Sequence, residues 1–129
     1  MKIAALIARI LLGLVFVVFG LNGFLHFIPQ PPMPPSDVTT FFTILVKSHY
    51  MVPVFALQVI GGALLLIGRF VPLGLTLLAP VLFNILLTHI LLAPSGLPLA
   101  GVATLLWLVV FAAYRQHFAG IFTANATPA

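Results

Sequence analysis

The hydrophobic positions of this chain gather into four long runs, with polar residues in the short stretches between them. No charged residue occurs in residues 10–25, between Lys47 and Arg69, or between Arg69 and Arg115. The last interval is too long for one membrane crossing, and residues 93–98, Ala-Pro-Ser-Gly-Leu-Pro, divide it with a turn. A spanning helix needs about 20 residues, so the pattern predicts four spans at about 4–27, 52–68, 72–92 and 98–117.

The only long connection, residues 28–51, divides into two parts. Its closely spaced prolines, in Ile-Pro-Gln-Pro-Pro-Met-Pro-Pro, exclude helix and predict an extended arm. Ser36 then reads as an N-cap, with Asp37 in the first turn. Apolar side chains recur at helical spacing on one face: Val38, Phe41, Phe42, Leu45 and Val46. The pattern predicts a short amphipathic helix over 36–48, lying in the membrane interface or folding over the spans as a lid.

Composition narrows the class of protein further. Of the 129 residues, 63% are hydrophobic and 5% are charged, whereas soluble domains carry about 25% charged residues. We expect a single all-α domain, an integral membrane four-helix bundle with a flexible tail over residues 119–129. Cysteine is absent, which excludes thiol redox chemistry, disulfides and covalent c-type haem. The few basic residues form no face that would bind nucleic acid.

The charged residues predict the orientation of the spans. Basic residues beside spans favour the cytoplasmic side. Lys2, Arg9, Arg69 and Arg115 fall on one side of the predicted membrane, and Lys47 falls alone on the other. We therefore expect a multi-pass protein with both termini in the cytoplasm.

Two features of the first span allow alternative interpretations. Arg9 lies about a turn and a half from the cytoplasmic end, so we favour a guanidinium that reaches the headgroups over a buried functional arginine. Lys2 before an apolar run could indicate a signal peptide. The run is long and has no small-x-small cleavage site, so we expect it to be retained.

Three amide side chains stand inside the apolar spans. Asn22, Gln58 and Asn84 each lie six to eight residues from the outer end of a predicted span, or roughly 9–12 Å deep at 1.5 Å per residue. Polar residues in a membrane usually face other helices or a cavity. The three amides are expected either to form the floor of a ligand pocket or to hydrogen-bond between helices.

Three further polar residues are expected at the rim of such a pocket. His26 lies one helical turn above Asn22, and Thr88 one turn above Asn84 with His89 beside it. His49 and Tyr50 approach from the predicted lid. Two histidines on different helices without a fixed spacing do not predict a metal or haem site.

Small residues and one proline predict how the helices pack. Gly13 and Gly20 share one face of the first span, and Gly61-Gly62 lies in the middle of the second. Such glycines let helix backbones approach closely in membranes. Pro80 removes a backbone hydrogen bond from the third span and is expected to kink it.

Several segments together resemble the DoxX family of small bacterial membrane proteins. They are residues 8–16 (ARILLGLVF), residues 19–24 (FGLNGF) and residues 58–66 (QVIGGALLL). The resemblance extends through Asn84 and His89 to Arg115. It implies a four-helix bundle in the bacterial inner (plasma) membrane, with relatives linked to a thiosulfate:quinone oxidoreductase and to oxidative-stress complexes. Gln58 stands where the family tends to have Glu, and an amide cannot relay protons.

The sequence contains no complete catalytic motif, so no catalytic residue is predicted. The first functional hypothesis is an accessory or quinone-binding subunit of a membrane redox complex, with a bound quinone or lipid and partner membrane subunits or a second copy. Aromatic residues expected to pack a quinone ring are Phe24, Phe27, Phe83 and Trp107.

Two other functions remain as alternatives. In the first, the protein is a non-catalytic anchor that docks a partner through the outer loop. In the second, it is a carrier or channel for a small solute. The second is disfavoured, because the inner half of the spans offers only Thr76 and Arg9 to a polar solute.

Overall fold

A computed structural model describes residues 2–129, and every regular element in that range is a helix. The elements, in chain order, are α1 (Lys2–Leu25), α2 (Asp37–Lys47), α3 (Met51–Ile67), α4 (Val71–Leu91), the short 3-10 helix η1 (Pro94–Gly96), α5 (Leu97–Tyr114) and the 3-10 helix η2 (Arg115–Phe122). The prediction of an all-α chain is confirmed.

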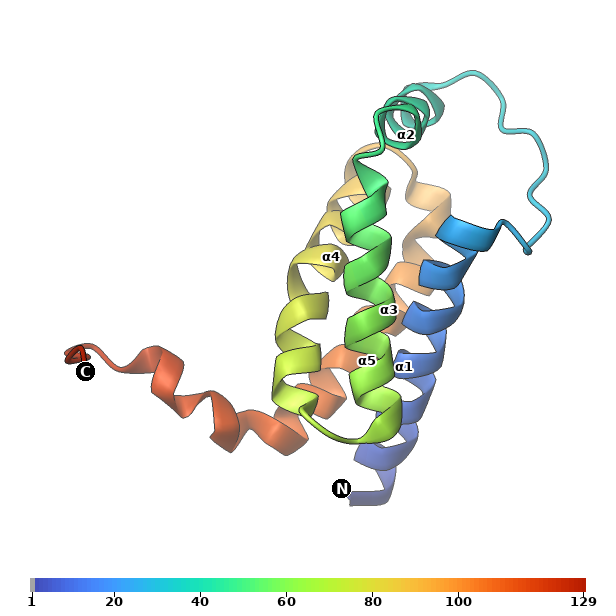
Figure 1. The fold of residues 1–129 in the computed structure, drawn as a ribbon. Helices are drawn as coiled ribbons and strands as arrows, with labels where there is room; N and C mark the ends of the chain where they lie inside the picture. The colour runs from blue at the N-terminus through green and yellow to red at the C-terminus, as the bar shows by residue number, and fades with distance from the viewer. Residues whose placement is uncertain (1) are drawn as a thin grey trace.

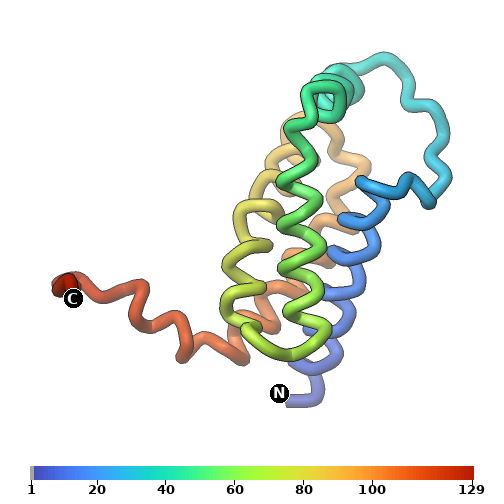
Figure 2. Tube along the Cα trace, viewed as in Figure 1, coloured from blue at the N-terminus to red at the C-terminus, as the bar shows by residue number. Residues whose placement is uncertain are grey.

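The four long helices pack side by side (Figure 1). Helix α1 contacts α3 and α5, and α4 contacts the same two helices, so the four close into a ring around one core. The fully buried side chains of that core come from all four helices: Leu12, Leu65, Leu75, Leu78 and Val110. Helix α2 lies across one end, and the extended residues between α1 and α2 arch outward before reaching it (Figure 2). We refer to this end as the α2 end.

Glycines set the spacing between α1, α3 and α4. A side chain at Gly62 would meet the carbonyl oxygen of Gly13 at 2.9 Å, and one at Gly74 of α4 would meet the carbonyl oxygen of Gly61 at 3.0 Å. The adjacent glycines of α3 therefore face two different helices. The predicted close packing at Gly13 and Gly61-Gly62 is confirmed.

The helix ends follow their sequence signals. Ser36 caps α2, with its hydroxyl oxygen accepting from the Thr39 amide at 3.3 Å, as predicted. Pro72 and Pro98 stand in the first turns of α4 and α5, where an amide donor is not needed. Helix α3 ends at Gly68, whose φ of 75° is the left-handed conformation that glycine adopts without strain.

The observed helices agree with the predicted spans to within three residues at each end. Three helical segments are long and apolar enough to cross a membrane: Lys2–Leu25, Val71–Leu91 and Pro94–Phe122. Helix α3 has 17 residues and makes a fourth candidate only together with α2, from which it is bent by 87°. At the C-terminus, η2 carries helix through Phe122, so the segment predicted as a flexible tail begins as helix.

The outward faces of the long helices are strongly apolar. Leu14 of α1, Ile60 of α3, Phe83 of α4 and Leu105 of α5 are among the large exposed hydrophobic residues. Exposed apolar surface this continuous is typical of helices that contact lipid or other helices.

We predict that Gly62→Ala lowers the free energy of unfolding by about 1–3 kcal/mol, because its methyl group would press on backbone atoms that cannot rotate away. Unfolding by SDS in mixed micelles measures this change. Gly101→Ala is the control: nothing lies within 4 Å of its added carbon, so stability should stay the same or rise slightly. A Gly62→Ala variant that loses no more stability than Gly101→Ala would contradict the tight α1–α3 contact.

Candidate functional site

A cavity of about 780 Å³ lies at the α2 end. Its apolar walls come from five helices: Val15, Phe16, Phe19 and Gly23 of α1, Phe42 and Val46 of α2, Met51 and Phe55 of α3, Ile85 of α4, and Leu99, Ala100 and Ala103 of α5. Its polar side chains are Asn22, His26, Gln30, Gln58 and His89. The cavity is therefore an apolar chamber with a few polar groups, as in most sites for small organic ligands.

Gln58 is the most buried polar residue of the cavity. The side chain is 7% exposed, and its amide makes no hydrogen bond within residues 2–129. The position of Gln58 follows from helix packing, because Gly20 of α1 lets the Cβ atom of Gln58 come within contact distance. Within residues 2–129 only Arg9 Nε is fully enclosed without a partner, so the unpaired amide of Gln58 keeps some exposed surface, and in the cavity it can donate to or accept from a polar atom.

Asn22 has a structural role besides lining the cavity. Its side-chain oxygen accepts a hydrogen bond from the Ile28 amide at 2.8 Å, and its carbonyl oxygen accepts one from the His26 amide at 2.8 Å. His26 takes the left-handed conformation, with φ 52°, and ends α1. Asn22 therefore fixes the turn by which the chain leaves α1 over the cavity.

His89 lines the cavity from α4 with a defined ring orientation. Its Nδ1 atom lies 2.7 Å from the carbonyl oxygen of Ile85. Because a carbonyl only accepts, Nδ1 carries the proton, and Nε2 of the neutral ring is left as an acceptor. A side chain at Gly96 would collide with this ring, so the ring packs directly on η1.

The prediction that three amides meet is wrong for Asn84. This residue is exposed, and its side-chain nitrogen donates to the Pro80 carbonyl oxygen of its own helix at 2.8 Å. Thr88 likewise donates to the Asn84 carbonyl oxygen at 2.9 Å and does not line the cavity. Packing turns the Asn84–Thr88 face of α4 outward and brings the His89 face inward. The structure thus brings together Asn22, His26, Gln58 and His89 and leaves out Asn84 and Thr88.

The aromatic residues of the cavity also differ from those predicted. Phe83 is 61% exposed, and Trp107 stacks on Phe111 with 5.2 Å between ring centres. Neither they nor Phe24 and Phe27 line the cavity, and neither do His49 and Tyr50. The cavity aromatics are Phe16, Phe19, Phe42 and Phe55.

One feature of the sequence could have predicted the space occupied by the cavity. Ala100 and Ala103 are three residues apart on α5, so both face the same side, and their small side chains leave room beside α1. Small residues at this spacing usually indicate close helix packing, and here they also widen a cavity.

We predict that Asn22→Ala destabilises the fold by about 1–3 kcal/mol, because the Ile28 amide loses its acceptor. The matched control is Asn84→Ala, which removes an exposed amide and should leave the SDS unfolding midpoint unchanged or higher. Similar losses in both variants would contradict the role assigned to Asn22.

Comparison of this chain with protein-family models, with curated proteins and with solved structures gives no match.

Proposed function

We propose that this protein is a four-span integral membrane protein that binds a lipophilic carbonyl compound of the quinone class in the cavity beneath α2. In this proposal it acts as an accessory or quinone-binding subunit of a membrane redox complex, as its resemblance to the DoxX family suggests. The observation that carries the proposal is Gln58, a residue only 7% exposed whose unpaired amide faces a largely apolar cavity.

The shape and polarity of the cavity suit such a ligand. A volume of about 780 Å³ lies within the range of roughly 300–1,000 Å³ typical of small-molecule sites. Aromatic rings from α1, α2 and α3 supply flat apolar surface for a quinone ring. The side-chain nitrogen of Gln58 can donate to a quinone carbonyl, and Nε2 of neutral His89 can accept from a quinol hydroxyl.

The same residues favour binding over catalysis by this chain alone. Gln58 cannot exchange a proton in the physiological range, and the only acidic residue of the chain, Asp37, begins α2 outside the cavity lining. The titratable groups of the cavity are His26 and His89. A subunit that only holds a quinone for a redox partner needs no further acid or base in its cavity.

The membrane orientation in this proposal follows from the ends of the bundle. Lys2, Arg9, Arg69 and Arg115 belong to the start of α1, the α3–α4 turn and the end of α5, which lie at the end opposite α2 (Figure 1). The excess of basic residues favours the cytoplasm for that end. The cavity then opens in the outer half of the inner membrane.

A second candidate function is an anchor that docks a partner subunit through α2. Phe41 and Ile44 of α2 are 40% and 59% exposed and lie outside the cavity lining. A photo-crosslinker placed at Ile44 in native membranes tests this function. A partner subunit would give a defined protein adduct, whereas contact with lipid alone would give none.

We predict that Gln58→Leu weakens binding of a short-chain quinone about tenfold, which corresponds to the loss of one buried hydrogen bond of about 1.4 kcal/mol. The same variant should be more stable without ligand, because it removes an unpartnered buried amide. Equilibrium binding of decylubiquinone and SDS unfolding of the purified protein measure the two effects.

The control for Gln58 is Asn84→Leu, the same kind of change on an exposed face, which should leave quinone binding unaltered. Quinone binding that survives Gln58→Leu, together with a loss of stability, would make Gln58 a packing residue and remove the basis for the proposal.

We predict that single cysteines report the orientation directly, because the natural chain contains none. Ser48→Cys, beside α2, should react with a membrane-impermeant maleimide in spheroplasts, whereas Gln116→Cys, after α5, should react only once the membrane is opened. The reverse pattern would place the cavity in the cytoplasmic half.

A further inference from the structure

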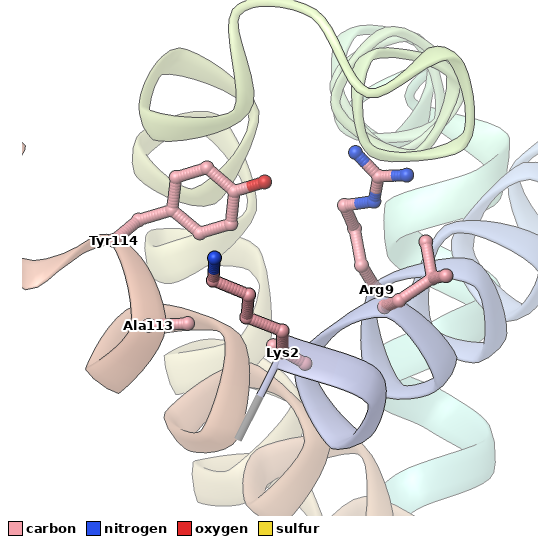
Figure 3. Close-up of a pocket in the computed structure, with 6 residues that line it drawn as sticks. Lys2, Arg9, Ala113 and Tyr114 are labelled. Carbon is pink, nitrogen blue, oxygen red and sulfur yellow. The ribbon is translucent and has the colours of Figure 1, made fainter.

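A second pocket, of about 310 Å³, lies between α1 and α5 at the end opposite α2 (Figure 3). It is lined by Lys2, Ala5, Leu6 and Arg9 of α1 and by Ala113 and Tyr114 of α5. In Figure 3 the Lys2 ammonium ends beside the Tyr114 ring, the Tyr114 hydroxyl points toward the side of the pocket that holds Arg9, and the Arg9 guanidinium rises toward the α3–α4 turn. Because Lys2 and Arg9 are seven residues apart on one helix, two turns bring both to the same face.

The pocket carries two positive charges and no negative one. Asp37, the only acidic residue, begins α2 at the far end of the bundle. The Nε atom of Arg9 is buried and has no hydrogen-bond partner within residues 2–129. The Arg9 guanidinium rests against Gly68 at the end of α3, where any larger residue would displace it. Packing therefore holds a cation beside the pocket, with Nε enclosed and the terminal guanidinium nitrogens left as the donors that a ligand can reach.

We propose that this pocket binds an anionic phosphate group, and that the phosphate belongs to an acidic phospholipid of the bilayer. A phosphate offers several acceptor oxygens, which suits an ammonium, a guanidinium and a phenol that two helices supply around one pocket. Ala5, Leu6 and Ala113 form an apolar border along which acyl chains can lie.

The lipid is the expected source because of where the pocket lies. The phosphate layer of a bilayer lies at the ends of spanning helices, and the pocket opens at the end of α1 and α5. Basic pockets between spanning helices are a common way for membrane proteins to hold acidic headgroups. This site shares no residue with the quinone cavity and does not depend on it.

Native mass spectrometry of the full-length protein, titrated with dioleoyl phosphatidylglycerol or dioleoyl phosphatidylcholine, tests the proposal. We expect one preferred phosphatidylglycerol, and an affinity about fivefold weaker in either Lys2→Gln or Arg9→Gln, from about 1 kcal/mol per basic residue. Tyr114→Phe should weaken binding by a smaller factor, and Arg9→Lys should retain most of it. Lys2→Gln and Tyr114→Phe keep the test valid should Arg9→Gln fail to fold.

The controls are Arg115→Gln, at the same end but outside the pocket, and Lys47→Gln beside α2. Both should bind phosphatidylglycerol as the natural chain does. Equal weakening in controls and pocket variants, or no preference for phosphatidylglycerol over phosphatidylcholine, would overturn the proposal. A second arm adds inorganic phosphate: displacement of the lipid only at high concentration supports a lipid site, whereas tight binding of free phosphate would overturn the assignment to lipid.

Discussion

The close approach of α1 to α3 is the contact on which the rest of the structure depends. Gly13, Gly20 and Gly23 of α1 face Gly62, Gln58 and Phe55 of α3, so the two helices touch along most of their length. Tight packing at small residues is how helices associate where the hydrophobic force between them is weak, as it would be in the proposed membrane location. The same contact fixes Gln58: its Cβ atom lies against α1 at Gly20, and the rest of its side chain is left to extend into the cavity.

The other polar side chains of the long helices show why Gln58 is unusual. Thr76 and Thr104 each donate to the carbonyl oxygen four residues earlier, and Trp107 donates from α5 to the Leu75 carbonyl oxygen of α4 at 3.1 Å. Such bonds let a polar side chain persist in an apolar environment without a cavity or a ligand. The Asn84 side chain likewise donates to the carbonyl oxygen four residues earlier, that of Pro80. Gln58 makes no such hydrogen bond, and this contrast within one chain is what supports its proposed role in binding a ligand.

The sequence predicted the elements well and their faces poorly, for one physical reason. Runs of apolar residues, prolines in first turns and the Ser36 cap determine where each helix begins and ends. The facing of a membrane helix depends on packing, because nearly every residue around it is apolar and no amphipathic stripe marks the inside. Gly61 and Gly62 predicted a contact correctly, because small residues let two helices pack closely. The amides of Gln58 and Asn84 look alike in the sequence, yet one faces the cavity and the other faces outward.

The distribution of small residues also explains why both pockets border α1 and α5. Glycines close the α1–α3 and α3–α4 contacts, where the backbones nearly touch. On α5 the small residues facing the pockets are alanines, Ala100 and Ala103 at one end and Ala113 at the other, and no glycine of α1 opposes them. The ring of four helices is thus tight around α3 and looser around α5. A ligand at either end would fill space that the packing of the other helices leaves open, so binding need not displace the core at Leu12 and Val110.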